Sequence, residues 1–249
     1  MESVLSLKSV SFAAQNALVV EEANLEIEAG KTTAFVGPSG GGKSTLLKLS
    51  AGLLIPSGGE VLYQGRDIAL MNRLQNLEFR RESAFVFQDS ALWANQSLFQ
   101  TLELPLRIHF PQMSRVERQR RIEDVMSAVG YKRSLAVRPA NLSMGEQKLI
   151  AFGRAMLCGP KLLFLDEWTE SLDDNAAQRL IALVKQQQSR NNTVVFVSHK
   201  PQIIRELADC AVMVAGGRIR GRLAGDQLKT GGDLLDLLER DPAEKDGEG

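Results

Sequence analysis

The first group of residues that could do chemistry is a glycine-rich loop that ends in a lysine and a serine. A short run at 32–36, Thr-Thr-Ala-Phe-Val, precedes it and is typical of a buried strand, and a helical pattern follows at 43–51. Between a strand and a helix, glycines let backbone N–H groups curl around phosphate oxygens, and the helix presents its positive end to the same anion. Lys43 can reach the outer phosphates of a nucleotide, and Ser44 can offer its hydroxyl to Mg²⁺. The predicted phosphate-binding residues are Gly37, Pro38, Ser39, Gly40, Gly41, Gly42, Lys43, Ser44 and Thr45.

Two acids follow a second apolar run. Residues 162–165 read as a buried strand, and Asp166 and Glu167 come directly after it. A strand that ends in two acids is common, and by itself it would indicate only a solvated strand end. Downstream of a phosphate-binding loop it resembles a Walker B motif. In that interpretation Asp166 holds Mg²⁺ through water, and Glu167 is the general base for an attacking water.

Four weaker signals complete a pattern. They are Gln88 after a predicted strand at 84–87, the segment Leu-Ser-Met-Gly-Glu-Gln-Lys at 142–148, Ser171-Leu172-Asp173, and His199 after a predicted strand at 194–197. Each is unspecific alone, because a single histidine at a strand end more often has a structural role. In this order, together with the loop and the acidic strand end, they resemble the nucleotide-binding subunits of ABC proteins, whose signature is LSGGQ. The resemblance covers about residues 3–225.

The resemblance implies an α/β fold. It consists of a P-loop (RecA-like) core with an antiparallel β subdomain and an α-helical insert subdomain that carries the ABC signature. The core and the antiparallel subdomain are expected at 1–89 and 159–225, the helical subdomain at 90–158, and a C-terminal helix with a disordered tail at 226–249. The residues agree: 25–28 alternate in polarity as an exposed strand does, and 116–129 keep a helical apolar stripe.

The resemblance also implies a mechanism in which two subunits, expected to be identical, pack head to tail. Each ATP lies between one P-loop and the signature helix of the other subunit. Ser143 and the Gly145 N–H would bind the γ-phosphate, and Asp173 would lie in the D-loop beside it. Gln88, Glu167 and His199 form the implied catalytic set, in which Gln88 senses the γ-phosphate and His199 holds the phosphate and the attacking water. The implied cofactors are ATP and Mg²⁺, with Ser44, Gln88 and Asp166 as the metal ligands.

Three departures from the family pattern carry predictions. Met144 stands where the signature has glycine, and Glu146 stands where it has glutamine. Glu146 would place a carboxylate near the nucleotide. This carboxylate either repels the triphosphate or turns away from it. Trp168 follows Walker B where transporters usually have proline. The adenine-stacking aromatic expected near the end of the first strand is missing, because only Phe12 is close. We therefore predict weak selection of ATP over GTP.

Two classes of protein contain an ATPase of this kind. In the first, the ATPase drives a membrane permease. The Gln-Asp-Ser-Ala-Leu-Trp stretch at 88–93 favours this class, because it is similar to the pattern of MCE-linked phospholipid-trafficking ATPases. In the second, the ATPase works without a permease, as in Suf-like iron–sulfur assembly, where LSGGE signatures occur. The expected cargo is a lipid or another hydrophobic molecule, and the direction of transport is left open.

The expected partners follow from the same resemblance and from the composition. They are a second ATPase subunit, transmembrane permease subunits, and a substrate-binding or MCE-domain protein. The formal net charge is zero, which argues against a nucleic-acid partner. No apolar run approaches the roughly 20 residues that span a bilayer, so a peripheral place on the cytoplasmic face of the inner membrane is expected. The apolar and acidic segment 233–238 predicts a short amphipathic helix.

Overall fold

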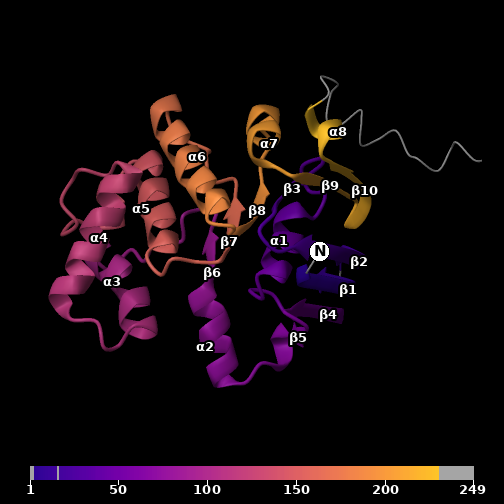
Figure 1. Ribbon diagram of the computed structural model, residues 1–249, viewed down its shortest axis with the longest axis horizontal. Coiled ribbons are helices and arrows are strands. Elements are labelled where there is room, and N and C mark those ends of the chain that lie inside the picture. The colour runs from indigo at the N-terminus through magenta and orange to yellow at the C-terminus, as the bar shows by residue number, and fades with distance from the viewer. Residues whose placement is uncertain (1–2, 16, 230–249) are drawn as a thin grey trace, which may run out of the picture. The chain divides into compact units, whose positions relative to one another are not determined.

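The computed structural model describes residues 3–15 and 17–229, and it divides into two compact units (Figure 1). The first unit comprises residues 1–71 and 195–249, and the second comprises residues 72–194. The amphipathic helix expected at 233–238 lies outside the described residues. Each unit is built around strands that leave functional residues at their ends. Over 3–15 and 17–229, no helix is long and apolar enough to cross a membrane.

The antiparallel sheet of the first unit has the strand order β2-β1-β4-β5. Its strands are β1 (Ser3–Ala14), β2 (Ala17–Glu28), β4 (Gly58–Tyr63) and β5 (Arg66–Asp67). Leu5 pairs with Ile27 and Leu7 with Leu25, and all four side chains are buried. The alternation in β2 that predicted a half-exposed strand is thus confirmed, because its glutamates lie on the other face.

Parallel strands in the first unit support the glycine-rich loop. β3 (Thr32–Val36) pairs in parallel with β9 (Cys210–Ala215), and β10 (Arg218–Ala224) returns antiparallel along β9. Every residue of β3 is buried, as was expected for this short run. The chain re-enters this unit through β8 (Thr193–Val197). The remaining elements are α1 (Lys43–Ser50), η1 (Ile68–Leu70), α7 (Pro201–Leu207) and α8 (Asp226–Lys229).

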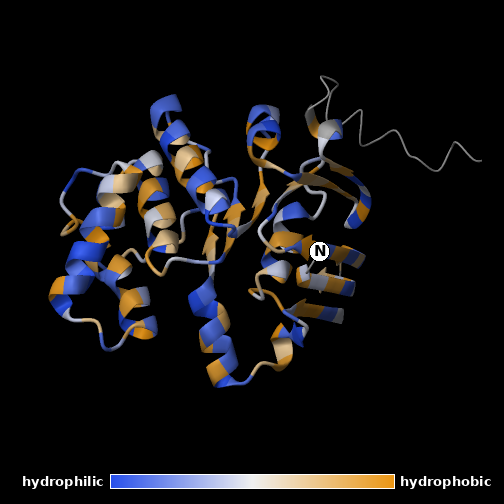
Figure 2. Cartoon of the chain, viewed as in Figure 1, coloured by the Kyte–Doolittle hydropathy of each residue, from blue (hydrophilic) through white to orange (hydrophobic). Residues whose placement is uncertain are grey.

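The second unit contains the strand that ends in two acids. β7 (Leu162–Asp166) pairs in parallel with β6 (Ser83–Val86), and β7 is buried along its whole length. Figure 2 shows these strands as apolar, whereas α2 (Arg73–Glu82) and α6 (Asp174–Ser189) alternate polar and apolar turns. Continuous apolar strands are typical of parallel sheets with both faces covered.

Three helices of the second unit pack against one another as the expected helical insert. They are α3 (Leu98–His109), α4 (Arg115–Val129) and α5 (Met144–Met156), with the short turn η2 (Pro139–Asn141) before α5. Each begins with a capping box, in which a serine and a glutamate or glutamine three residues later satisfy each other's backbone N–H groups. In α4 the box is formed by Ser114 and Glu117, and the helix ends at Gly130, which has a left-handed conformation.

Candidate nucleotide-binding site

The glycine-rich loop of the first unit is shaped by positions where only glycine fits. Gly37 has φ 133°, and a Cβ there would lie 2.2 Å from the carbonyl oxygen of Val214 in β9. A Cβ on Gly41 would lie 2.7 Å from the same oxygen. The loop therefore lies directly on the backbone of β9, and its crown of Pro38, Ser39 and Gly40 is exposed. An exposed turn of backbone N–H groups before a helix is the geometry that binds phosphate.

Lys43 is the first residue of α1 and closes over this loop. Its Nζ donates to the carbonyl oxygens of Gly37 at 2.9 Å and of Pro38 at 2.7 Å, and the residue is only 6% exposed. Ser44 and Thr45 follow on the first turn and are half-buried. The ammonium group is thus held at the mouth of the loop, where it can reach the outer phosphates of a nucleotide.

His199 also belongs to the first unit. It is exposed in the short link between β8 and α7, as expected for a residue that acts on a ligand rather than in the core. The Oγ of Ser198 accepts a hydrogen bond from the backbone N–H of Lys200 at 3.2 Å, which fixes the turn that carries the histidine.

The acidic end of β7 in the second unit is almost completely buried. Asp166 is 1% exposed and Glu167 is 5% exposed. Glu167 has φ 42°, a left-handed conformation that costs a side-chain-bearing residue about 1 kcal/mol. Trp168 packs behind it, with its ring 5.8 Å from that of Phe152 in α5. The large indole thus fills the space that follows Walker B and helps to fix the strained turn.

Lys148 of α5 connects three functional segments. Its Nζ donates to the carbonyl oxygens of Gln88 at 2.5 Å, Glu167 at 3.2 Å and Phe87 at 3.4 Å. The residue is only 2% exposed, and this burial lowers the pKa of its ammonium group, an effect that nearby acids oppose. The signature helix therefore positions the backbone of both Gln88 and Glu167.

Arg154, one and a half turns further along α5, holds the same loop. Its guanidinium donates to the carbonyl oxygens of Ala91 at 2.7 Å and Ser90 at 3.1 Å. Both of these residues have positive φ angles, and Gln88, exposed just before them, donates from Nε2 to Glu170 at 3.2 Å. Sequence reasoning missed Lys148 and Arg154. The available signal was their position in an otherwise apolar helical stretch at 148–156, where a charge is expected to be buried with partners.

The signature segment forms the N-terminus of α5. Ser143 is the N-cap, and its Oγ accepts from the backbone N–H of Glu146 at 3.2 Å. The Glu146 carboxylate accepts from the Ser143 N–H at 2.9 Å and from Nη1 of Arg133 at 2.9 and 3.0 Å. The hydrogen bond from Arg133 lowers the pKa of Glu146 and raises that of Arg133. The Glu146 carboxylate is therefore held both by the cap of its own helix and by Arg133.

Gly145 packs closely against the segment that precedes α6. A Cβ on Gly145 would lie 2.9 Å from the carbonyl oxygen of Ser171, which itself has φ 62°. Asp173 is the N-cap of α6 and accepts from the Ala176 N–H at 2.8 Å. The second unit thus brings the signature turn, the 171–173 segment, Gln88 and Glu167 together around α5. The predicted phosphate-binding loop and His199 belong to the first unit.

Comparisons with known proteins agree with these features. Residues 20–170 match the family described as ABC transporter. The chain is 31% identical over 234 residues to the intermembrane phospholipid transport system ATP-binding protein MlaF of Haemophilus influenzae, covering 94% of this chain and 88% of MlaF. It is 34% identical over 230 residues to the nickel import ATP-binding protein NikE of Shigella flexneri serotype 5b, covering 90% and 85%.

A solved structure gives the same result. The dimeric ATP-binding cassette MJ0796, in a post-hydrolysis state bound to ADP and Pi, matches with a TM-score of 0.82 at 26% identity, over 88% of this chain and 98% of that one. The fold and the site define an ABC-type ATPase, and the chain belongs to the ABC transporter family. Within this family it is an ATP-binding subunit that hydrolyses ATP.

Proposed function

We propose that two copies of this chain close around two ATP molecules and drive a bacterial membrane permease. The observation that carries the proposal is the connection through Lys148, which links helix α5, whose N-terminus is the signature, to Gln88 and Glu167. In this arrangement, contact of the signature with a nucleotide is transmitted through α5 to the general base, Glu167, and to the Gln88 loop, which faces the permease. The dimeric MJ0796 cassette supports the pairing of two chains.

Each residue has a distinct role in this proposal. The loop 37–45 and Lys43 hold the phosphates of ATP, and the Ser143 hydroxyl and Gly145 N–H of the other copy bind the γ-phosphate, with Asp173 beside them. Glu167 accepts the proton of the attacking water. His199 orients that water and the phosphate.

The donor set also fits Mg²⁺. Ser44, Asp166 and Gln88 offer hydroxyl, carboxylate and amide oxygens, which are the donors this ion prefers. When bound, Mg²⁺ would neutralise charge on the phosphates. Asp166 lies at the buried end of β7, where its carboxylate is held on a rigid strand.

The cargo we propose is a lipid or another hydrophobic molecule. The stretch that follows Gln88 is similar to that of MCE-linked ATPases, and MlaF is named for phospholipid transport. NikE, which is named for nickel import, matches equally well, so sequence identity alone does not select a cargo. The partners we propose are permease subunits and a substrate-binding or MCE-domain protein, with the ATPase on the cytoplasmic face of the inner membrane.

A second candidate is a permease-free ATPase of the Suf-like iron–sulfur assembly class. Two specific observations favour it, namely Glu146 in the signature and the buried Trp168 where transporters usually have proline. The family match and the stretch after Gln88 favour the transporter.

Affinity purification from membranes tests the proposal. The chain is tagged in its native cell, membranes are solubilised in mild detergent, and co-purifying proteins are identified by mass spectrometry. A multi-span permease supports the transporter, and an MCE-domain protein beside it supports a lipid cargo. Recovery without any membrane protein, together with assembly factors, would contradict the proposal and favour the second candidate.

A further inference from the structure

Glu146 raises an electrostatic problem in the proposed function. The signature turn must approach the triphosphate of the ATP bound by the other copy, and a carboxylate there would repel it. The Glu146 carboxylate lies within hydrogen-bond distance of the Ser143 N–H and of Arg133, at 2.9 Å in each case. In the proposed function Ser143 contacts the γ-phosphate, so the carboxylate would lie one hydrogen bond away from a group that binds the nucleotide.

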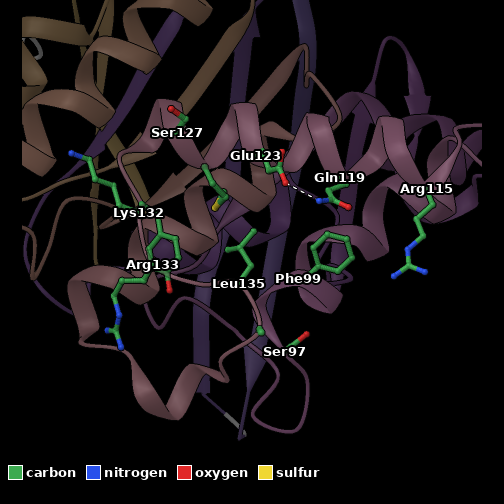
Figure 3. A pocket seen from close by; sticks show the side chains of 12 residues that line it. Ser97, Phe99, Arg115, Gln119, Glu123, Ser127, Lys132, Arg133 and Leu135 are labelled. Carbon is green, nitrogen blue, oxygen red and sulfur yellow. Dashed lines mark hydrogen bonds between the residues drawn. The ribbon is translucent and has the colours of Figure 1, made fainter.

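Arg133 offers the compensating charge. It comes from the loop between α4 and η2, and one of its Nη atoms donates to both oxygens of Glu146. Lys132 and Arg133 line a groove of about 860 Å³ together with Phe99, Met126 and Leu135, and Figure 3 shows the side chains of Lys132 and Arg133 pointing in different directions. Only Arg133 turns to the signature helix, and Lys132 has no ion pair among residues 3–15 and 17–229.

We propose that Arg133 is a positioning residue for ATP-driven closure, which holds the Glu146 carboxylate in the helix cap and cancels its charge next to the signature. The inference rests on the proposed function. It gives Glu146, the acidic residue of the signature, an ion-pair partner, Arg133, that lies outside the signature segment. The Ser143 backbone is held by the carboxylate, and the carboxylate is held by Arg133, so loss of Arg133 affects both the charge and the geometry of the turn.

The pair is accessible to salt. The side chain of Arg133 is 51% exposed and that of Glu146 is 26% exposed, so dissolved ions screen their attraction. A purely structural contact with the core would be insensitive to ionic strength. Salt dependence therefore separates an electrostatic role from a packing role.

A double-mutant cycle tests the proposal in a Glu167→Gln reference protein that binds ATP without turning it over. The measurement is the ATP concentration that gives half-maximal dimer, followed by light scattering. Arg133→Gln is expected to raise this concentration about tenfold, because the carboxylate then opposes the triphosphate. Glu146→Gln keeps the capping box and has no charge, so it is expected to dimerise at the reference concentration or below it. The double variant Arg133→Gln/Glu146→Gln is expected to return close to Glu146→Gln.

Lys132→Gln is the matched control, since it removes a neighbouring charge on the same groove and is expected to leave the half-maximal concentration unchanged. The reference protein should lose dimer more steeply with added salt than the double variant does. A normal Arg133→Gln protein, or a double variant as impaired as Arg133→Gln, would overturn the role of Arg133 and leave the proposed function intact. If the reference protein itself forms no dimer with ATP, the proposed function fails, and this inference fails with it.

Discussion

At the residue scale, Lys148 is the side chain that connects the Gln88 loop with Glu167 in the second unit. Its ammonium group is almost fully buried and donates to carbonyl oxygens on the Gln88 loop and at Glu167. Burial lowers its pKa, and the acids Glu170, Asp166 and Asp89 oppose the shift. A buried charge that is satisfied by backbone carbonyls positions those carbonyls.

Replacing Lys148 with methionine removes the donor and keeps most of the volume. We expect kcat to fall about 10- to 100-fold, because Glu167 and Gln88 lose their common support, while KM for ATP changes much less. The free energy of unfolding should fall by about 1–3 kcal/mol, since buried carbonyls lose a partner. Steady-state kinetics and chemical denaturation measure both effects, and Lys132→Met is the exposed control. A normal kcat would remove Lys148 from this role.

Residue-scale prediction from the sequence is possible where a local motif exists. Ser143 and Glu146 form a Ser-x-x-Glu pattern, which is itself a capping-box signature, so the orientation of the Glu146 carboxylate could have been predicted. Arg133 could not, because it reaches Glu146 from across the η2 loop and no spacing rule connects them. Phe12, the one aromatic residue near the end of the first strand, is half-buried.

At the element scale, the sequence predicted the strands and helices that have a clear period. β3 and β7 were expected as buried strands and β8 as a strand, and each of the three is fully buried. The support of the Gln88 loop by α5 was not predictable. It depends on which side of the helix faces the loop, and Lys148 and Gln88 are 60 residues apart in the sequence. Contacts of such long range depend on the packing of the whole unit.

The glycine-rich loop gives a prediction with an internal control. Gly37→Ala places a Cβ 2.2 Å from the Val214 carbonyl oxygen, so the loop must move off β9 and nucleotide binding should be lost. Gly40→Ala has no atom within 4 Å of its Cβ and suffers only from its φ of 74°, which costs about 1 kcal/mol. We expect it to retain nucleotide binding, weakened about tenfold at most. Fluorescent-nucleotide titration measures both, and equal affinities would contradict the close packing of the loop.

At the scale of the whole molecule, the candidate site divides between the two units. The loop 37–45 and His199 lie in the first unit, and Gln88, Asp166, Glu167, Ser143, Gly145 and Asp173 lie in the second. The family fold was predictable because six motifs occur in order along the chain. The roles assigned to the individual site residues stay predictions, as do the domain boundaries expected from the sequence.

The selection of ATP over GTP is a property of the whole nucleotide-binding protein. Ala13 and Ala14 follow Phe12 in β1, so this strand ends without an aromatic side chain that would stack on adenine. We expect kcat/KM for GTP to lie within about tenfold of that for ATP, because stacking of a base on an aromatic ring is worth roughly 1–3 kcal/mol. Competition kinetics with both nucleotides measure the ratio. A strong preference for ATP would show that another residue recognises the base.

The central claim is that two copies of this chain enclose ATP and that Glu167 is the general base for its hydrolysis. The most direct measurement is the molar mass of the Glu167→Gln protein in solution with Mg²⁺ and either ATP or ADP, together with its ATPase rate. We predict a stable dimer with ATP, a monomer with ADP, and a rate reduced by roughly 10²-fold or more, because a positioned general base has been removed. A protein that stays monomeric at saturating ATP, or that hydrolyses ATP at the wild-type rate, would contradict the account.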